Sequence, residues 1–224
     1  MLNHPPRTRL KVCCIASIDE ARVAIAHGAD ALGLVARMPS GPGPIDDDTI
    51  ASIAAAVPPP IATFLLTCET EPRAVVAHAR STGVNTVQLV DDSTGPDVYS
   101  ALRDALPALR IVQVVHVVDR SSVDHALKLA PLVDALLLDS GNPAAAVREL
   151  GGTGRVHDWG LSREIVLRAE CPVFLAGGLN PSNIRGAVAA VSPFGVDLCG
   201  GVRTNGRLDG AKLSAFVAAL HARG

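Results

Sequence analysis

Short apolar runs alternate along the whole chain with segments that carry apolar residues at helical spacing. The runs consist mostly of Val, Leu, Ile and Ala, a composition typical of strands that are buried on both faces. Helix signals frame the segments between them. Ser17 precedes Glu20 at capping-box spacing, and Gly28 and Gly83 stand where helices are expected to end. This alternation predicts a parallel sheet covered by helices.

Eight strand–helix units follow one another without an intervening linker. Eight units favour a closed barrel over an open sheet, so the sequence predicts an α/β fold, a (β/α)8 TIM barrel, with residues 1–224 in a single domain. The predicted strands cover residues 10–15, 31–36, 61–66, 84–89, 111–118, 133–138, 172–176 and 195–198. The predicted helices cover residues 17–27, 46–56, 71–80, 97–106, 121–130, 162–169, a segment that begins near Asn180, and 208–222.

Two diglycine turns follow the last two predicted strands. Gly177 and Gly178 come after the seventh strand, and Gly200 and Gly201 come after the eighth. Glycine lets backbone N–H groups approach an anion closely, and a helix N-terminus adds a partial positive charge. We expect Asn180 to cap the helix behind the first turn. Together the two turns predict the phosphate site that barrels of this kind carry after strands seven and eight.

Composition narrows the class of protein further. The chain has 48% hydrophobic and 19% charged residues and a formal net charge of −2. This balance favours a large core and gives no support for a nucleic-acid partner, whose footprint is a basic patch. No apolar run is long enough for a transmembrane helix, and residues 1–9 lack an apolar secretory region. The five cysteines have neither framework nor zinc spacing, so we expect reduced thiols, no metal and a cytoplasmic location.

Candidate chemistry follows from the rule that barrel active sites lie at the carboxyl ends of the strands. Cys13 and Cys14 end the first strand, Asp139 ends the sixth, and Asp197 lies near the end of the eighth. A thiol and a carboxylate across the barrel mouth divide the work of a base and an acid, if the pKa of the thiol is lowered. Side chains alternate along a strand, so one of the two cysteines is expected to face the interior and the other the helices.

Each candidate also has a purely structural interpretation. A cysteine beside an apolar strand is usually a packing residue. An aspartate at the end of a strand is often only a turn former or a helix cap. From residue types alone, both interpretations stay open.

Several motifs in order resemble the phosphoribosylanthranilate isomerase family. Residues 11–15, Lys-Val-Cys-Cys-Ile, resemble the Lys-Val-Cys-Gly-Ile-Thr opening of that family. Residues 137–139, Leu-Leu-Asp, match its acid-bearing strand end, and residues 151–154 with 158–159 match its glycine-rich loop. Residues 175–183 and 195–202 match its last two phosphate turns. The resemblance extends along nearly the whole chain and agrees with the predicted barrel.

The resemblance implies a reaction and a set of roles. The family opens the ribose of N-(5-phosphoribosyl)anthranilate by an Amadori rearrangement, a step of tryptophan biosynthesis that needs no cofactor or metal. Its ligand is thus a small phosphoribosyl molecule, not a nucleic acid or a membrane. By the same resemblance Cys13 is the general base and Asp139 the general acid. The substrate and phosphate contacts implied are Gly152, Gly154, Gly177, Gly178, Asp197, Gly200 and Gly201.

The chain departs from the family pattern mainly around the base and the aglycone pocket. Cys14 replaces a glycine, Val90 a histidine, and Gly43 the arginine that holds the anthranilate carboxylate. Arg37 lies nearby in sequence and is the candidate to replace that arginine. Besides the isomerase, two alternatives follow: a paralogue with the same mechanism on another phosphoribosyl amine or sugar phosphate, and a phosphosugar-binding barrel without turnover.

Overall fold

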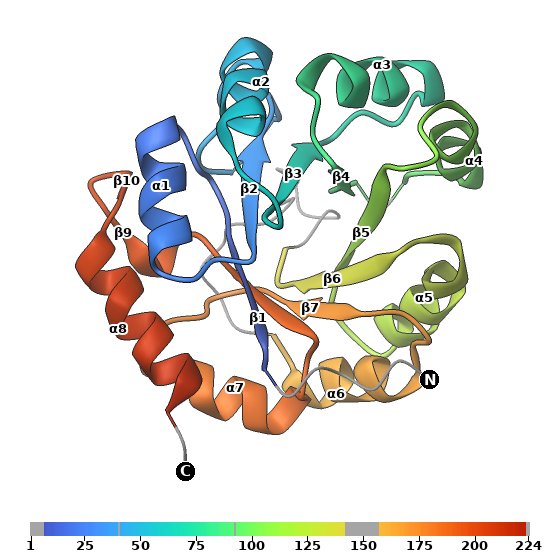
Figure 1. Cartoon of the computed structure of the whole chain (residues 1–224). Coiled ribbons are helices and arrows are strands. Elements are labelled where there is room, and N and C mark those ends of the chain that lie inside the picture. Colours follow the sequence, from blue (N-terminus) through green and yellow to red (C-terminus); the bar gives the residue numbers. More distant parts are fainter. Residues whose placement is uncertain (1–6, 40, 92, 142–156, 223–224) are drawn as a thin grey trace.

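Eight parallel strands close into a barrel, and helices surround it on the outside (Figure 1). The computed structural model describes residues 7–39, 41–91, 93–141 and 157–222. The strands pair in chain order, and β1 closes the ring against β8, with Lys11 opposite Asp197. The predicted barrel is therefore confirmed. The strands are β1 (Arg9–Val12), β2 (Ala31–Val35), β3 (Ala62–Thr67), β4 (Thr86–Leu89), β5 (Arg110–His116), β6 (Ala135–Asp139), β7 (Val173–Leu175) and β8 (Gly195–Leu198).

Several helices begin at the caps that the sequence signals, whereas the helix Trp159–Arg168 begins three residues before its predicted start, with Asp158 as its cap, and the helix after β7 is treated below. The Ser17 hydroxyl accepts the amide of Glu20, Asp46 caps α2, and Gly83 ends α3 with a positive φ of 65°. After β8 the short helix η2 (Gly200–Val202) leads into a small hairpin of β9 (Arg203–Thr204) and β10 (Arg207–Leu208), which the sequence patterns did not predict. The α-helices are α1 (Ile18–Ala26), α2 (Asp47–Ala56), α3 (Pro72–Thr82), α4 (Pro96–Ala105), α5 (Ser121–Leu129), α6 (Trp159–Arg168), α7 (Ile184–Val191) and α8 (Gly210–His221), with η1 (Ala130–Leu132) after α5.

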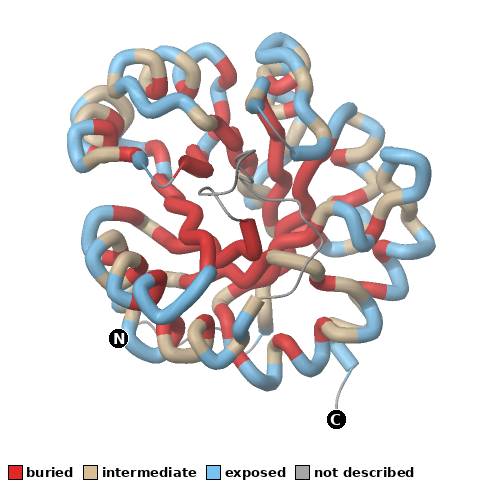
Figure 2. Tube along the Cα trace, turned by 180° about the vertical axis from the view of Figure 1, so that it is seen from behind, coloured by how far each residue is buried: buried red, intermediate tan, exposed pale blue. Residues whose placement is uncertain are grey.

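Alternation along the strands divides the core into two clusters. One set of side chains fills the space between strands and helices, and the other fills the barrel interior. Figure 2 shows the strands buried at the centre and the exposed stretches on the outer sides of the helices. Both faces of every strand are covered, which explains why the strands read as continuous apolar runs rather than as alternating patterns. The interior set includes Val35, Phe64, Val112, Leu137 and Phe174.

The helix after β7 begins later than predicted. Asn180 does not cap it; α7 starts at Ile184, with Asn183 at the cap position. The Asn180 side chain instead accepts the amide of Ser182 at 2.9 Å, and the Asn183 side chain accepts the amide of Asn180 at 2.8 Å. Asparagine readily forms such local turns. Three further residues of turn therefore separate the diglycine from the helix.

The first strand ends before both cysteines. β1 stops at Val12, and Cys14 has a left-handed φ of 63°. Alternation holds only for extended backbone, so it does not apply beyond this point. The expectation that one cysteine faces the helices is wrong: Cys13 and Cys14 both turn toward the barrel mouth.

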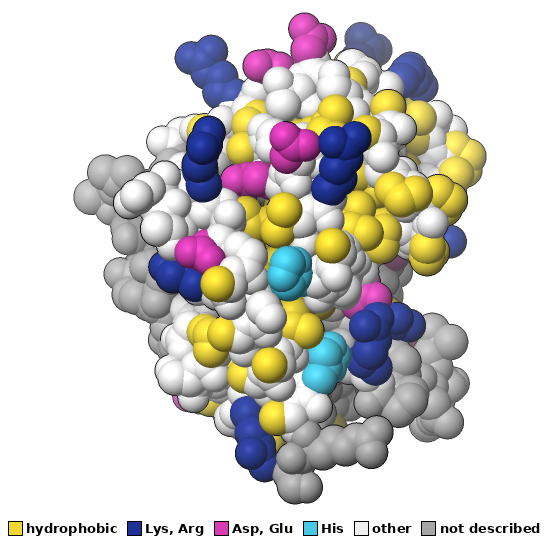
Figure 3. All heavy atoms as spheres, turned by 60° about the vertical axis from the view of Figure 1, so that its left-hand side comes forward, with side chains coloured by type: hydrophobic (Ala, Val, Ile, Leu, Met, Phe, Trp, Pro, Cys, Tyr) yellow, Lys and Arg dark blue, Asp and Glu magenta, His cyan; other side chains and the backbone are white. Residues whose placement is uncertain are grey.

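The outer surface carries charges of both signs. On the face that includes α1 and α8, basic and acidic side chains lie among hydrophobic ones (Figure 3). In the part of the chain that the structure describes, no helix is both long and apolar enough to cross a membrane.

Candidate active site

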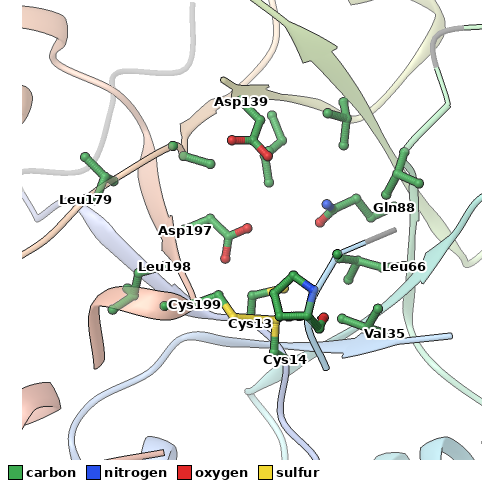
Figure 4. Close-up of a pocket in the computed structure, with 18 of the residues that line it drawn as sticks. Cys13, Cys14, Val35, Leu66, Gln88, Asp139, Leu179, Asp197, Leu198 and Cys199 are labelled. Atoms are coloured by element: carbon green, nitrogen blue, oxygen red, sulfur yellow. Dashed lines mark hydrogen bonds between the residues drawn. A yellow bond between two sulfur atoms is a disulfide. The ribbon is translucent and has the colours of Figure 1, made fainter. Parts of the chain in front are cut away.

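A cavity opens at the carboxyl ends of the strands, where the sequence places its candidate chemistry (Figure 4). Cys13, Asp139, Asp197 and the two diglycine turns all line it. These residues come from the ends of β1, β6, β7 and β8, which meet only because the sheet closes. The structure thus brings together residues that lie far apart in the sequence, from Cys13 to Gly201. Apolar residues complete the wall: Val35, Met38, Leu66, Val90, Val114 and Leu137.

Asp139 is the last residue of β6, and its carboxylate points into the cavity (Figure 4). The side chain is buried, with 9% of the residue exposed. One oxygen, Oδ1, accepts the amide of Ser140 at 2.7 Å. That bond fixes the carboxyl group at the edge of the cavity, where it is placed to exchange a proton with a bound molecule.

Cys13 lies buried at the opposite wall. Burial raises the pKa of its thiol to about 11, because the charged thiolate is poorly solvated there. The Lys11 ammonium opposes this rise, and the Asp197 carboxylate adds to it. At neutral pH this raised pKa favours the thiol.

Asp197 shares its carboxylate between the cavity and a buried lysine. Its Oδ2 accepts a hydrogen bond from the Lys11 ammonium at 2.8 Å, and Lys11 is fully buried. Burial raises the pKa of the Asp197 carboxyl, and the charge of Lys11 opposes the rise. Its other oxygen, Oδ1, is buried and has no partner among the described residues. This oxygen is available to a hydrogen-bond donor on a ligand.

Sequence reasoning did not select Lys11 or Gln88 as site residues. Lys11 is a charged residue inside an apolar strand, and that unusual placement was the available signal. Gln88, on β4, is 3% exposed and lines the cavity. Its Oε1 has no partner among the described residues.

The two diglycine turns touch each other. Gly177 and Gly178 have positive φ angles of 84° and 61°, which favour glycine. A β-carbon on Gly201 would stand 2.5 Å from the carbonyl oxygen of Leu179, so only glycine permits this approach of the two backbones. A β-carbon on Gly200 would meet nothing within 4 Å.

A disulfide joins Cys14 to Cys199 at the rim of the cavity (Figure 4). Their Cα atoms are 6.0 Å apart, a distance usual for such bonds. The expectation that all five cysteines are reduced is therefore wrong; Cys13, Cys68 and Cys171 take no part in this bond. The sequence offered no signal for this pairing, because 185 positions separate the two residues and only barrel closure brings them together.

Arg203 anchors the backbone of Cys13 and Cys14. Its guanidinium donates hydrogen bonds to the carbonyl oxygens of Cys13 and Cys14 and forms an ion pair with Glu20. Glu20 in turn accepts the amides of Ala16 and Leu208. One buried ion pair thus ties the β1 end, the start of α1 and the hairpin together.

The remaining predicted residues lie elsewhere. Arg37 is exposed and is not among the residues that line the cavity. Gly152 and Gly154 lie outside the described residues. Within the described ranges, no group of three or more His, Cys, Asp or Glu side chains is arranged to hold a metal ion.

Comparison with known proteins gives a consistent result. Residues 10–219 match the family model described as N-(5'phosphoribosyl)anthranilate (PRA) isomerase. An N-(5'-phosphoribosyl)anthranilate isomerase of Halobacterium salinarum is 38% identical over 214 residues, 94% of each chain. The corresponding protein of Haloferax volcanii is 39% identical, covering 95% of this chain and 92% of its own.

Solved structures agree with these relatives. A phosphoribosyl anthranilate isomerase of Thermococcus kodakaraensis superposes with a TM-score of 0.80 at 28% identity, over 96% of this chain and 99% of its own. Another, in complex with reduced 1-(o-carboxyphenylamino)-1-deoxyribulose 5-phosphate, gives 0.77 at 25% identity, over 95% and 98%.

Proposed function

Because the chain belongs to the N-(5'phosphoribosyl)anthranilate isomerase family, we propose that its cavity converts N-(5'-phosphoribosyl)anthranilate into the 1-deoxyribulose 5-phosphate product, a step of tryptophan biosynthesis. The observation that carries the proposal is the placement of Cys13 and Asp139 on one cavity, beside the two glycine turns. A base, an acid and an anion site are the three parts that this rearrangement requires.

Asp139 is the general acid of the proposed reaction. Its carboxyl proton passes to the ribose ring oxygen as the bond from that oxygen to C1 breaks. The nitrogen lone pair forms the C1–N double bond, so the open chain is an iminium cation with a new hydroxyl. The position of the Asp139 carboxyl group inside the cavity supports this role.

Cys13 is the general base of the second half. The iminium acidifies the C2–H bond, and the thiolate takes that proton while the electron pair moves to form the enolamine. Proton return to C1 and loss of the hydroxyl proton at C2 give the ketone, so the reaction is a net isomerisation. A cation beside the thiol favours thiolate, and the iminium thus offsets part of the burial that raises the pKa of Cys13 to about 11.

Backbone amides bind the phosphate in this proposal. Gly177, Gly178, Gly200 and Gly201 line one end of the cavity, and the amides of Gly177 and Gly178 bond to no other described residue. Free N–H groups clustered in this way suit a phosphate dianion. The unpartnered Oδ1 of Asp197 is placed to accept a hydrogen bond from a ribose hydroxyl.

The anthranilate ring occupies the apolar half of the cavity. Met38, Leu66 and Val90 offer it a hydrophobic wall. Since Arg37 lies exposed away from this wall, we assign it no part in holding the carboxylate.

The experiment is turnover of N-(5'-phosphoribosyl)anthranilate by the purified protein, followed by growth of a tryptophan auxotroph that lacks this step. We expect turnover and growth. Cys13→Ala and Asp139→Asn should each lose about 10²- to 10⁴-fold in kcat, the usual cost of a missing general base or acid. A folded wild-type protein without turnover, or a Cys13→Ala variant with wild-type kcat, would overturn the proposal.

A further inference from the structure

Lys11 is the only fully buried lysine that the described part of the chain contains, and it lies inside the barrel below the cavity. Its ammonium donates to Asp197 Oδ2 at 2.8 Å and lies 5.2 Å from the centre of the Phe64 ring. It is not one of the residues that line the cavity. A charge in this place is costly.

Because Gly33 has no side chain, Lys11 and the Cys13 thiol both lie close to its backbone. A β-carbon on Gly33 would stand 2.8 Å from Cys13 Sγ and 3.1 Å from Lys11 Nζ. The two atoms therefore border the same small space on β2. Both Asp197 and Cys13 raise the pKa of Lys11. Thiol, ammonium and the Asp197 carboxylate thus form one buried cluster.

Charge in this cluster is balanced while Cys13 is a thiol. Lys11 and Asp197 neutralise each other, so ionising the thiol leaves one uncompensated negative charge in a buried place. Arg203 is a more distant cation bound to the Cys13 carbonyl oxygen, and Asp139 is a further carboxyl group that faces Asp197. Of these groups, Lys11 is the cation placed to stabilise the thiolate directly.

We propose that Lys11 is a positioning residue for Cys13, whose buried ammonium is shared between Asp197 and the thiol and sets how readily that thiol ionises. The proposal rests on the proposed function only in treating Cys13 as the base. It assigns Asp197 a second role, as the competitor for the same ammonium. Burial lowers the pKa of Lys11, but Asp197 and then Cys13 raise it above the usual value overall, so the ammonium stays charged.

Removing the charge of Lys11 and removing the charge of Asp197 should shift the ionisation of the Cys13 thiol in opposite directions. Lys11→Met leaves the thiolate beside Asp197 alone, so ionisation becomes harder. Asp197→Asn leaves Lys11 without its carboxylate, so the thiolate becomes the partner of the ammonium and ionisation becomes easier. A role that is only structural gives the same sign in both variants, because loosened packing exposes the thiol in each.

The experiment is alkylation of Cys13 by iodoacetamide between pH 7 and 10, measured by mass spectrometry of the peptide that contains it. No reductant is added, so the Cys14–Cys199 bond stays closed, and Cys171 and Cys68 are internal controls. We expect the Cys13 rate at pH 8 to fall about tenfold or more in Lys11→Met and to rise about tenfold in Asp197→Asn, since tenfold corresponds to one pKa unit. The control cysteines should change less than about twofold.

If the Lys11→Met variant does not fold, a second comparison tests the proposal. The Lys11→Met/Asp197→Asn double variant removes both charges, and its Cys13 rate should lie at least about tenfold below that of Asp197→Asn. Equal rates in these two variants, or a rise in Lys11→Met, overturns the proposal. Alkylation needs no substrate, so the result does not depend on turnover. Where the protein also turns over, the acid limb of kcat/KM against pH should shift upward in Lys11→Met.

Discussion

Gly43 lies directly against Cys14: a β-carbon on Gly43 would stand 2.6 Å from the β-carbon of Cys14. Two departures from the family pattern that are 29 positions apart in sequence are therefore one feature in space. The loop after β2 lacks its arginine at the place where the β1 end carries a cysteine instead of glycine. With Cys199, three departures are connected around one disulfide.

Arginine at position 43 should cost less stability when position 14 is glycine than when it is cysteine, while the left-handed φ of 80° at Gly43 adds strain in both backgrounds. In the wild type, Gly43→Arg forces a side chain onto Cys14 and should cost about 1 to 3 kcal/mol by overpacking. In the Cys14→Gly background the cost should be smaller, because the obstructing β-carbon is gone. Urea unfolding of the four proteins of this double-mutant cycle measures the difference.

The matched control for this cycle is the Cys199→Ser background. It removes the disulfide but keeps the β-carbon of Cys14, so Gly43→Arg should cost there what it costs in the wild type. Equal costs in all three backgrounds would show that Cys14 is not the obstacle.

Gly201→Ala should impair binding of the substrate phosphate, whereas Gly200→Ala should not. The added methyl group at position 201 meets the Leu179 carbonyl oxygen at 2.5 Å and pushes the two turns apart, but at position 200 it meets nothing within 4 Å. Loss of one amide bond to a charged group, worth about 1.5 to 3 kcal/mol, raises KM about 10- to 100-fold. Steady-state kinetics and titration with inorganic phosphate measure it; equal effects of the two variants count against the phosphate site.

Opening the disulfide should destabilise the barrel. The bond closes a loop of 185 positions, and a cross-link of this length typically contributes about 2 to 4 kcal/mol. Cys199→Ser should therefore lower the free energy of unfolding by about that amount, and dithiothreitol should have the same effect on the wild type but none on the variant. Cys68→Ser, a change at a cysteine outside this bond, is the control. An unchanged urea midpoint in Cys199→Ser would contradict a closed bond in solution.

Glu20 should make stability depend on acid pH. Burial raises the pKa of its carboxyl, but bonds from the Leu208 and Ala16 amides and from Arg203 lower it below the usual value overall. A group with a lowered folded-state pKa stabilises the fold above its unfolded-state pKa, about 4.3, and loses this contribution as pH falls through the folded value. Glu20→Gln should therefore be less stable than wild type at pH 7, and the two urea midpoints should converge below about pH 4. Parallel midpoints from pH 7 to 3 would contradict this.

The fold could be predicted because its signals are local. Apolar runs bounded by Ser17, Asp46 or Gly83 mark each unit, and the count of units determines the closed sheet. The start of the helix after β7 could not be predicted from the sequence, because the side chains of Asn180 and Asn183 accept backbone amides in the turn that precedes it.

The site was only half predictable, for a different reason. Asp139 ends β6 and Cys13 directly follows β1, so topology places both on one cavity. The direction in which the Cys14 side chain points depends on the left-handed φ of Cys14 itself, which no hydrophobic pattern encodes. Lys11 and Asp197 meet through the register of the first strand with the last, and that register exists only in the closed barrel.

The bond between Cys14 and Cys199 encloses every strand from β2 to β8. Covalently, the molecule is a large ring with two short tails. A protease that cuts any one loop within the ring opens it but releases no fragment, so the nicked protein keeps its mass until a thiol is added. Damage to a loop around the cavity would therefore leave Cys13, at one end of the ring, still tethered to Gly200 and Gly201 at the other.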